Sequence, residues 1–309
     1  MKKVDAIFCA DLHLRPDRPI ARTDNYQKAQ FVALDFILDL QYKHECPIFC
    51  AGDFGNQPLN IGWPTWFSAK VIEHLNNFER PVRDIFVCLG QHDLPQHRLE
   101  AWPESGLGVL AAAEVIQLIG IKERKYIIID NYCVHAFPYG TTLEQINVKE
   151  KSVALVHMMV IKDKPLWPGQ QALTARAILE KYPGYDLIIS GDNHQSFVET
   201  VDGRHLVNCG SMMRMRADQM DHEPAVFLWY AELNKIRRIA LPIRPAEEVL
   251  TRLHIDKKEE KNERMTAYVE SLKAKYEVGL SYTDNLDAYF QNNITRKNVK
   301  EKVWECVLN

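Results

Sequence analysis

The stretch VDAIFCADLHLR, residues 4–15, decides how the rest of the chain is interpreted. Its apolar first part has the length of a β-strand, and Asp11 and His13 follow at once. Because side chains alternate along an extended segment, the spacing predicts that Asp11 and His13 point to the same side. A carboxylate and an imidazole are common metal ligands. The pair therefore indicates half of a metal site, whose other ligands are expected further along the chain.

Outward from this stretch, apolar runs of strand length alternate with segments of helical periodicity. Helices are predicted from Tyr26 to Tyr42 and from Thr65 to Phe78, and strands over residues 47–51 and 84–89. The order strand, helix, strand, helix, strand predicts a parallel sheet with right-handed crossovers.

The second half of the chain has a different pattern. It predicts a hairpin about Asn131, a strand over residues 152–156, a helix from about Gln170 to Lys181 and a strand over 187–190. Four more runs alternate in the manner of an antiparallel meander, at 196–200, 204–208, 225–231 and 236–241. The predicted fold class is α/β, a two-sheet sandwich flanked by helices.

The composition is that of an ordinary globular protein of 309 residues, 46% hydrophobic and 26% charged. A net charge of −3 does not indicate a generally basic nucleic-acid-binding protein, although bound cations and local arginines can contact phosphate. Seven cysteines with no CxxC motif predict free thiols in a reducing compartment. No signal peptide or membrane span is indicated, so a cytoplasmic protein is expected.

The composition changes near Pro242-Ile243-Arg244-Pro245, beyond which the chain is more charged and has helical periodicity. We predict a core over residues 1–244 and a helical C-terminal extension over residues 245–309.

The predicted strands end in residues that bind metals or transfer protons. These ends are Asp11-Leu12-His13, Gly52-Asp53, Gly90-Gln91-His92-Asp93, His157 and Gly191-Asp192-Asn193-His194. Open α/β sheets place their sites at the carboxyl ends of parallel strands, and glycine allows the backbone to turn sharply there. The joint pattern predicts a single shared site.

These five motifs resemble those of the calcineurin-like metallophosphoesterases, DxH, GDxx(D/N), GNH(D/E), a lone His and GHxH, in the same order. The resemblance covers residues 4–240. Within that superfamily the chain is most similar to the SbcD-type nucleases that act on DNA ends. The segments that carry this narrower likeness are Leu94-Pro95, 105–110 leading into 114–116, and 208–214.

The resemblance implies two bound divalent cations. Their implied ligands are Asp11, His13 and His194 for the first ion, Asp53 between the ions, and Gln91, His157 and Asp192 for the second. Gln91 stands where the family has Asn, and Asp192 stands where it has His. Harder oxygen ligands favour Mn²⁺, with Mg²⁺ as the alternative, over Zn²⁺. The same two departures leave open a weakened second site.

The resemblance also implies catalytic and substrate-binding roles. His92 would stabilise the phosphate or protonate the departing oxygen, and Asp93 would orient His92. The candidate substrate-binding residues are Arg15, His97, Arg98 and Arg214.

The expected function is a two-metal phosphodiesterase that hydrolyses DNA, an SbcD-type exonuclease with endonuclease activity also open, in DNA end processing, repair or recombination. One alternative is a phosphoesterase for a small diester such as a cyclic nucleotide. Another is a catalytically weakened scaffold that binds DNA or an ATPase. The expected partners are DNA and an SbcC-type ABC ATPase held by the C-terminal helices, and a homodimer is left open.

Overall fold

The computed structural model describes residues 3–56, 62–76, 84–147, 150–275 and 281–308. The chain divides into two compact units, Met1–Thr251 and Arg252–Asn309. The division falls after α5 (Ala246–Val249), a short helix that the sequence analysis placed in the C-terminal extension.

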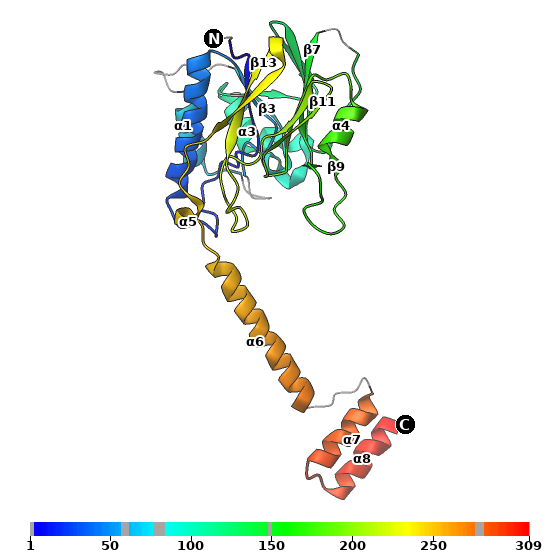
Figure 1. Ribbon diagram of the computed structural model, residues 1–309. Helices are drawn as coiled ribbons and strands as arrows, with labels where there is room; N and C mark the ends of the chain where they lie inside the picture. Colours follow the sequence, from blue (N-terminus) through cyan, green and yellow to red (C-terminus); the bar gives the residue numbers. More distant parts are fainter. Residues whose placement is uncertain (1–2, 57–61, 77–83, 148–149, 276–280, 309) are drawn as a thin grey trace. The chain divides into compact units, whose positions relative to one another are not determined.

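The first unit contains two six-stranded sheets with helices outside them, which confirms the predicted fold class (Figure 1). The strands of the first sheet are, in spatial order, β14 (Lys235–Ala240), β13 (Ala225–Tyr230), β1 (Ala6–Cys9), β2 (Ile48–Cys50), β3 (Ile85–Cys88) and β4 (Gln117–Ile119). Those of the second are β11 (Phe197–Val201), β12 (Arg204–Asn208), β10 (Leu187–Gly191), β7 (Lys151–His157), β6 (Tyr132–Phe137) and β5 (Tyr126–Ile129).

Helices cover the outer faces of these sheets, and α1 and α4 lie on opposite sides of the sandwich in Figure 1. The helices are α1 (Tyr26–His44), α2 (Thr65–Leu75), α3 (Gly106–Ala112) and α4 (Ala175–Lys181). Short 3₁₀ turns span Gln91–Asp93, Pro95–His97, Leu99–Glu104 and Ala231–Leu233, and a small separate sheet pairs β8 (Val160–Ile161) with β9 (Leu173–Thr174).

Alternation along the buried strands explains the layers. In β1, Ile7 and Cys9 belong to the core that contains α1 and α2, whereas Ala6 and Phe8 belong to the core between the two sheets. In β7, Val153 and Leu155 also face that inner core, while the intervening side chains pack with α4. The inner strands β1 and β7 are therefore apolar on both faces, as expected for strands covered on each side.

Trp229 joins the two sheets. Its indole is fully buried, packs on Phe8 at a ring separation of 6.2 Å and on Tyr132 at 5.1 Å, and donates to Asn234 Oδ1 at 2.9 Å. Phe8 is in the first sheet and Tyr132 in the second, so the indole fills the space between them.

We expect Trp229→Ala to lower the free energy of unfolding by about 3–5 kcal/mol, the usual cost of truncating a large buried aromatic residue. Pulse proteolysis in increasing urea measures the change. Trp167→Ala is the control, because Trp167 is 52% exposed, and its midpoint should stay near that of the parent. Equal midpoints for both variants would contradict this role.

Several local predictions are corrected by the structure. The four runs after residue 196 do not form one meander, because β11–β12 is a hairpin in the second sheet and β13–β14 is a hairpin in the first. The helix predicted from Gln170 begins only at Ala175, after the short strand β9. Helix α2 ends at Leu75, and Phe78 lies outside the described residues. The hairpin about Asn131 is confirmed.

The second unit consists of α6 (Leu253–Lys275), α7 (Tyr282–Asn292) and α8 (Lys297–Leu308). Within it, Phe290 of α7 is buried, its ring lies 6.4 Å from that of Trp304, and its carbonyl accepts from Lys300 Nζ at 2.8 Å. Helices α7 and α8 thus share a small aromatic core. None of the helices in the described ranges combines the length and apolar character needed to cross a membrane.

Candidate metal centre

The carboxyl ends of strands from both sheets meet at one place. Strands β1, β2 and β3 of the first sheet lead into the first three motifs, and β7 and β10 of the second sheet lead into the last two. The fold therefore gathers residues from positions 11 to 194 into one centre.

The backbone at this centre differs from the sequence prediction. Strand β1 ends at Cys9, and Asp11 and His13 have left-handed φ angles of 51° and 46° rather than extended ones. Asp53 and Asp192 also have positive φ, at 49° and 84°. Such conformations are uncommon outside glycine and collect at functional sites. Asp11 and His13 do reach the same centre, but through a segment with positive φ at both residues and not through strand alternation.

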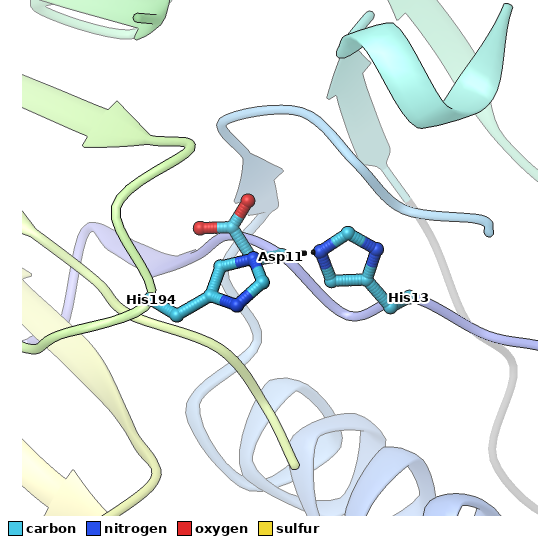
Figure 2. A group of neighbouring side chains, drawn as sticks. All are labelled: Asp11, His13 and His194. Carbon is cyan, nitrogen blue, oxygen red and sulfur yellow. Dashed lines mark hydrogen bonds between the residues drawn. The ribbon is translucent and has the colours of Figure 1, made fainter. Parts of the chain in front are cut away.

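Asp11, His13 and His194 form the first group whose ligand atoms could hold a metal, all within 4.8 Å of one another. Figure 2 shows the rings of His13 and His194 approaching from two separate segments, the loop after β1 and the loop after β10. Their Nε2 atoms are 3.0 Å apart. Burial lowers the pKa of both imidazoles, that of His194 to about 4 and that of His13 well below its usual value. Both rings are therefore neutral at pH 7, as metal ligation requires.

Asp11, Asp53 and His157 form the second such group. His157 Nδ1 lies 2.7 Å from the carbonyl oxygen of Ala51, so Nδ1 carries the proton and donates it. Nε2 of the same ring is left facing Asp53 Oδ2 at 3.4 Å. Burial would lower the pKa of His157, but its interactions with Asp53, the charge of Asp11 and the hydrogen bond to Ala51 together outweigh burial and raise the pKa to about 10. A cation bound between His157 Nε2 and Asp53 Oδ2 would take the place of the proton on Nε2.

Two glycines allow this close approach. A Cβ at Gly52 would lie 2.1 Å from His157 Nδ1, and Gly52 has a φ of +94°. A Cβ at Gly90 would lie 2.2 Å from Asp53 Oδ1. The glycines of the second and third motifs are thus required by packing around the site, as well as by the turn that the sequence analysis invoked.

The donor set fits divalent cations. Three buried polar atoms at this centre have no hydrogen bond: Oδ2 of Asp53, Oε1 of Gln91 and Nε2 of His157, and the first and last of these face each other at 3.4 Å. Leaving buried polar atoms unpaired is costly, and a bound cation is one way to satisfy them. Carboxylate, amide and imidazole groups are ligands of divalent cations in proteins.

Gln91 and Asp192 contact each other directly. Gln91 Nε2 donates to Asp192 Oδ1 at 2.6 Å, and Asp192 N donates to both carboxylate oxygens of Asp11, at 3.0 and 3.1 Å. Asp192 therefore fixes the amide of Gln91 so that its carbonyl oxygen stays unpaired. The two positions at which this chain departs from the family motif thus form a matched pair.

His92 lies at the more open side of the centre. Its main-chain N–H donates to Asp53 Oδ1 at 2.8 Å, which fixes that carboxylate, and its partly exposed ring lies 5.1 Å from that of His13. The ring is close enough to the ligands to reach a phosphate bound there.

Asp93 has a different role from the one expected. Its carboxylate is buried and accepts from Gly55 N at 2.7 Å and from Gly90 N at 2.9 Å. Burial, followed by the charge of Asp53, raises the pKa of Asp93 to about 7. The hydrogen bonds that the structure gives this carboxylate come from main-chain amides and not from His92. Asp93 therefore ties the second motif to the third.

The candidate substrate-binding residues lie in different environments. Arg15 pairs with Asp17 at the surface, and Arg98 is exposed. Arg214 is buried and donates to the carbonyl oxygens of His222 at 2.7 Å and Arg244 at 2.9 Å, so its guanidinium serves loop packing and this placement does not support substrate contact. His97 lies beside the third motif, with Nδ1 3.0 Å from the carbonyl oxygen of Gln91.

Asn208 supports the centre in a way that the sequence analysis did not foresee. It is buried, and its amide nitrogen donates to the carbonyl oxygens of Asn193 and Gln195. Its Oδ1 accepts from Ser190 at 2.8 Å. Asn208 thus holds the loop that carries His194. The sequence placed Asn208 at the end of a strand and in the SbcD-like segment 208–214, but neither feature reveals what it contacts.

The fold and the centre define a metal-dependent phosphoesterase. The chain belongs to the calcineurin-like phosphoesterase family, whose model it matches over residues 6–196. A comparison with curated proteins gives no match.

Solved structures with a related fold have low sequence identity to the chain. A dimetal phosphatase from Danio rerio is 10% identical over 78% of this chain and 96% of its own, with a TM-score of 0.49. An archaeal phosphodiesterase is 13% identical over 76% and 99%, with a TM-score of 0.38. A putative 5′-nucleotidase from Staphylococcus aureus is 13% identical over 78% and 53%, with a TM-score of 0.44.

Proposed function

We propose that this protein is a two-metal phosphodiesterase that hydrolyses DNA, an exonuclease of the SbcD type. The observation that carries the metal-dependent chemistry is the convergence of two buried ligand groups at one centre, Asp11, His13 and His194 in one and Asp11, Asp53 and His157 in the other. The DNA substrate is supported by the sequence likeness to SbcD-type nucleases at Leu94-Pro95, 105–110 and 208–214.

Divalent cations bound here supply an acidified water and neutralise the charge of the phosphoryl group. The chain's own residues prepare the centre for this chemistry. The N–H of His92 holds one oxygen of Asp53 and leaves the other free, and the carbonyl of Ala51 sets the tautomer of His157. Asp192 fixes the side-chain amide of Gln91 by accepting from its Nε2. The ligands are therefore oriented before any cation binds.

The imidazole of His92 acts on the substrate side. It is not needed as a ligand, and an imidazole N–H can donate a hydrogen bond or a proton to an oxygen. We assign it to protonate the departing sugar oxygen, or to donate a hydrogen bond to that oxygen as negative charge develops on it.

The test is a nuclease assay on end-labelled linear duplex and single-stranded DNA after removal of bound metal by a chelator. We expect no cleavage without added cation and cleavage restored by Mn²⁺ more than by Mg²⁺, together with two-site Mn²⁺ binding in calorimetry. A closed circular substrate separates endonuclease from exonuclease activity. Turnover of cyclic nucleotides with none of DNA would favour the small-diester alternative, and Mn²⁺ binding without any hydrolysis would favour the scaffold.

We also propose that the second unit binds a coiled-coil segment of an SbcC-type ABC ATPase. Its helix α6 carries Met265, Tyr268 and Val269 at helical spacing, which supplies one apolar stripe on a charged helix. Co-purification of the ATPase with the full chain, and its loss in Tyr268→Asp, is the expected result. Retained co-purification with Tyr268→Asp would show that this stripe is not the contact.

A further inference from the structure

A row of aromatic rings leads from the buried metal ligands to the surface. The ring of His13 lies 5.1 Å from that of His92, which lies 6.2 Å from that of His97, which in turn lies 6.2 Å from that of Tyr139. His13 is buried, His92 is partly exposed, and His97 and Tyr139 are exposed. The metal centre therefore continues outward into a surface of two rings, which we name the His97–Tyr139 shelf.

Both members of the shelf are held by main-chain contacts to the end of β3. His97 Nδ1 lies 3.0 Å from the carbonyl oxygen of Gln91, and Tyr139 N donates to the carbonyl oxygen of Leu89 at 2.9 Å. Leu89 and Gln91 flank the glycine that packs on Asp53. The position of the shelf is thus fixed relative to the ligands, although it comes from two separate segments of the chain.

The backbone supports a functional reading of this shelf. Gln96 and His97 are consecutive residues with positive φ, at 52° and 57°, in a region that L-residues rarely adopt. Positive φ also occurs at Asp11, Asp53 and Asp192 in the metal centre, and away from it at residues such as Glu45 and Asn234. Non-glycine residues held in this conformation collect at ligand-binding sites, because surrounding contacts must compensate for the strain. Here the strained turn places the His97 ring beside His92.

We infer that the His97–Tyr139 shelf binds the nucleobase of the nucleotide whose phosphate lies at the metal centre. This inference rests on the proposed function, because it requires a nucleotide phosphate at the cations. The base of a nucleotide is separated from its phosphate by one sugar, and the shelf begins one ring beyond His92. Every base has a π-face, so stacking on aromatic rings gives affinity with little sequence preference. Because Nδ1 of His97 donates to the carbonyl oxygen of Gln91, its Nε2 can accept a hydrogen bond from a base.

The test compares ligands that differ only in the base. We expect a deoxynucleoside monophosphate to bind the Mn²⁺-loaded protein about tenfold to a hundredfold more tightly than deoxyribose phosphate, in line with the usual strength of base–aromatic stacking. Tyr139→Ala should remove most of this difference, whereas Tyr139→Phe should retain it. On DNA, Tyr139→Ala should raise KM by a similar factor and leave kcat nearly unchanged. On DNA whose terminal nucleotide is abasic, Tyr139→Ala should leave KM unchanged.

The chain offers a matched control in Tyr126, an exposed tyrosine whose ring lies 5.6 Å from His135 on the β5–β6 hairpin. Tyr126→Ala should leave the base preference unchanged. Equal affinity of the parent for the deoxynucleoside monophosphate and deoxyribose phosphate would contradict base binding at the shelf. The same loss of base preference in Tyr126→Ala and Tyr139→Ala would also contradict it. Base-dependent binding with no hydrolysis of DNA would instead contradict the proposed nuclease activity and support base binding at the shelf.

Discussion

Asp53→Asn is expected to lower kcat/KM for DNA by about 10³-fold, because neutralising phosphoryl charge at a metal pair is worth several kcal/mol and each 1.4 kcal/mol is tenfold in rate. Asp53 is the residue that both metal groups approach: its Oδ2 lies 3.7 Å from His13 Nε2 and 3.4 Å from His157 Nε2. Asparagine keeps the shape and the oxygen that accepts from His92, but loses the negative charge and one anionic oxygen.

The substitution should act first on cation binding. Burial would raise the pKa of Asp53, yet His157 and His13 hold it below its usual value, so the parent side chain is ionised at pH 7. Calorimetry at a temperature where circular dichroism shows the variant folded should show weaker Mn²⁺ binding in Asp53→Asn. Its unfolding midpoint should fall, because the buried His157 loses its charged partner. Asp218→Asn, which changes an exposed aspartate paired with Arg216, is the control and should retain full activity. Full activity in Asp53→Asn would remove the basis for two-metal hydrolysis.

The parts of the fold that depend on local patterns could be predicted from the sequence. Strands β1, β2 and β3 and helices α1 and α2 follow from apolar runs and helical periodicity, and their parallel pairing follows from the alternation of strands and helices. Strand β4 was missed because it is three residues long and follows the short helix α3. The sheet that each hairpin joins depends on tertiary packing. The alternation of apolar and polar residues therefore could not predict that β11–β12 and β13–β14 lie in different sheets.

In the site, too, local features could be predicted from the sequence and long-range contacts could not. Motif order was sufficient to predict that residues around Asp11, Asp53 and His157 would converge, because each follows a strand. Contacts between distant residues were not predictable in detail. Gln91 and Asp192 are 101 positions apart, and the hydrogen bond between them makes one departure from the family motif compensate for the other. Asp93 was assigned to His92 because they are adjacent, whereas the structure turns its carboxylate to main-chain amides.

His92→Ala should lower kcat for DNA by about 10²- to 10⁴-fold, the usual range for losing a general acid, while Mn²⁺ affinity remains close to that of the parent. Mn²⁺ affinity should be retained because His92 contacts Asp53 through its main-chain N–H, which alanine also has. His44→Ala, which removes a histidine at the end of α1, should have no effect and serves as the control.

Leaving-group dependence distinguishes protonation from simple positioning. A p-nitrophenyl diester departs as a stable anion and needs little help from an acid, whereas a sugar oxygen departs as a strong base and needs a proton. The loss in His92→Ala should therefore be much smaller for the nitrophenyl substrate than for DNA. Equal losses on both substrates would mean that His92 stabilises the phosphate rather than protonating the departing oxygen. No loss on either would place the ring outside the reaction, and the open side of the centre would then need a different proton donor.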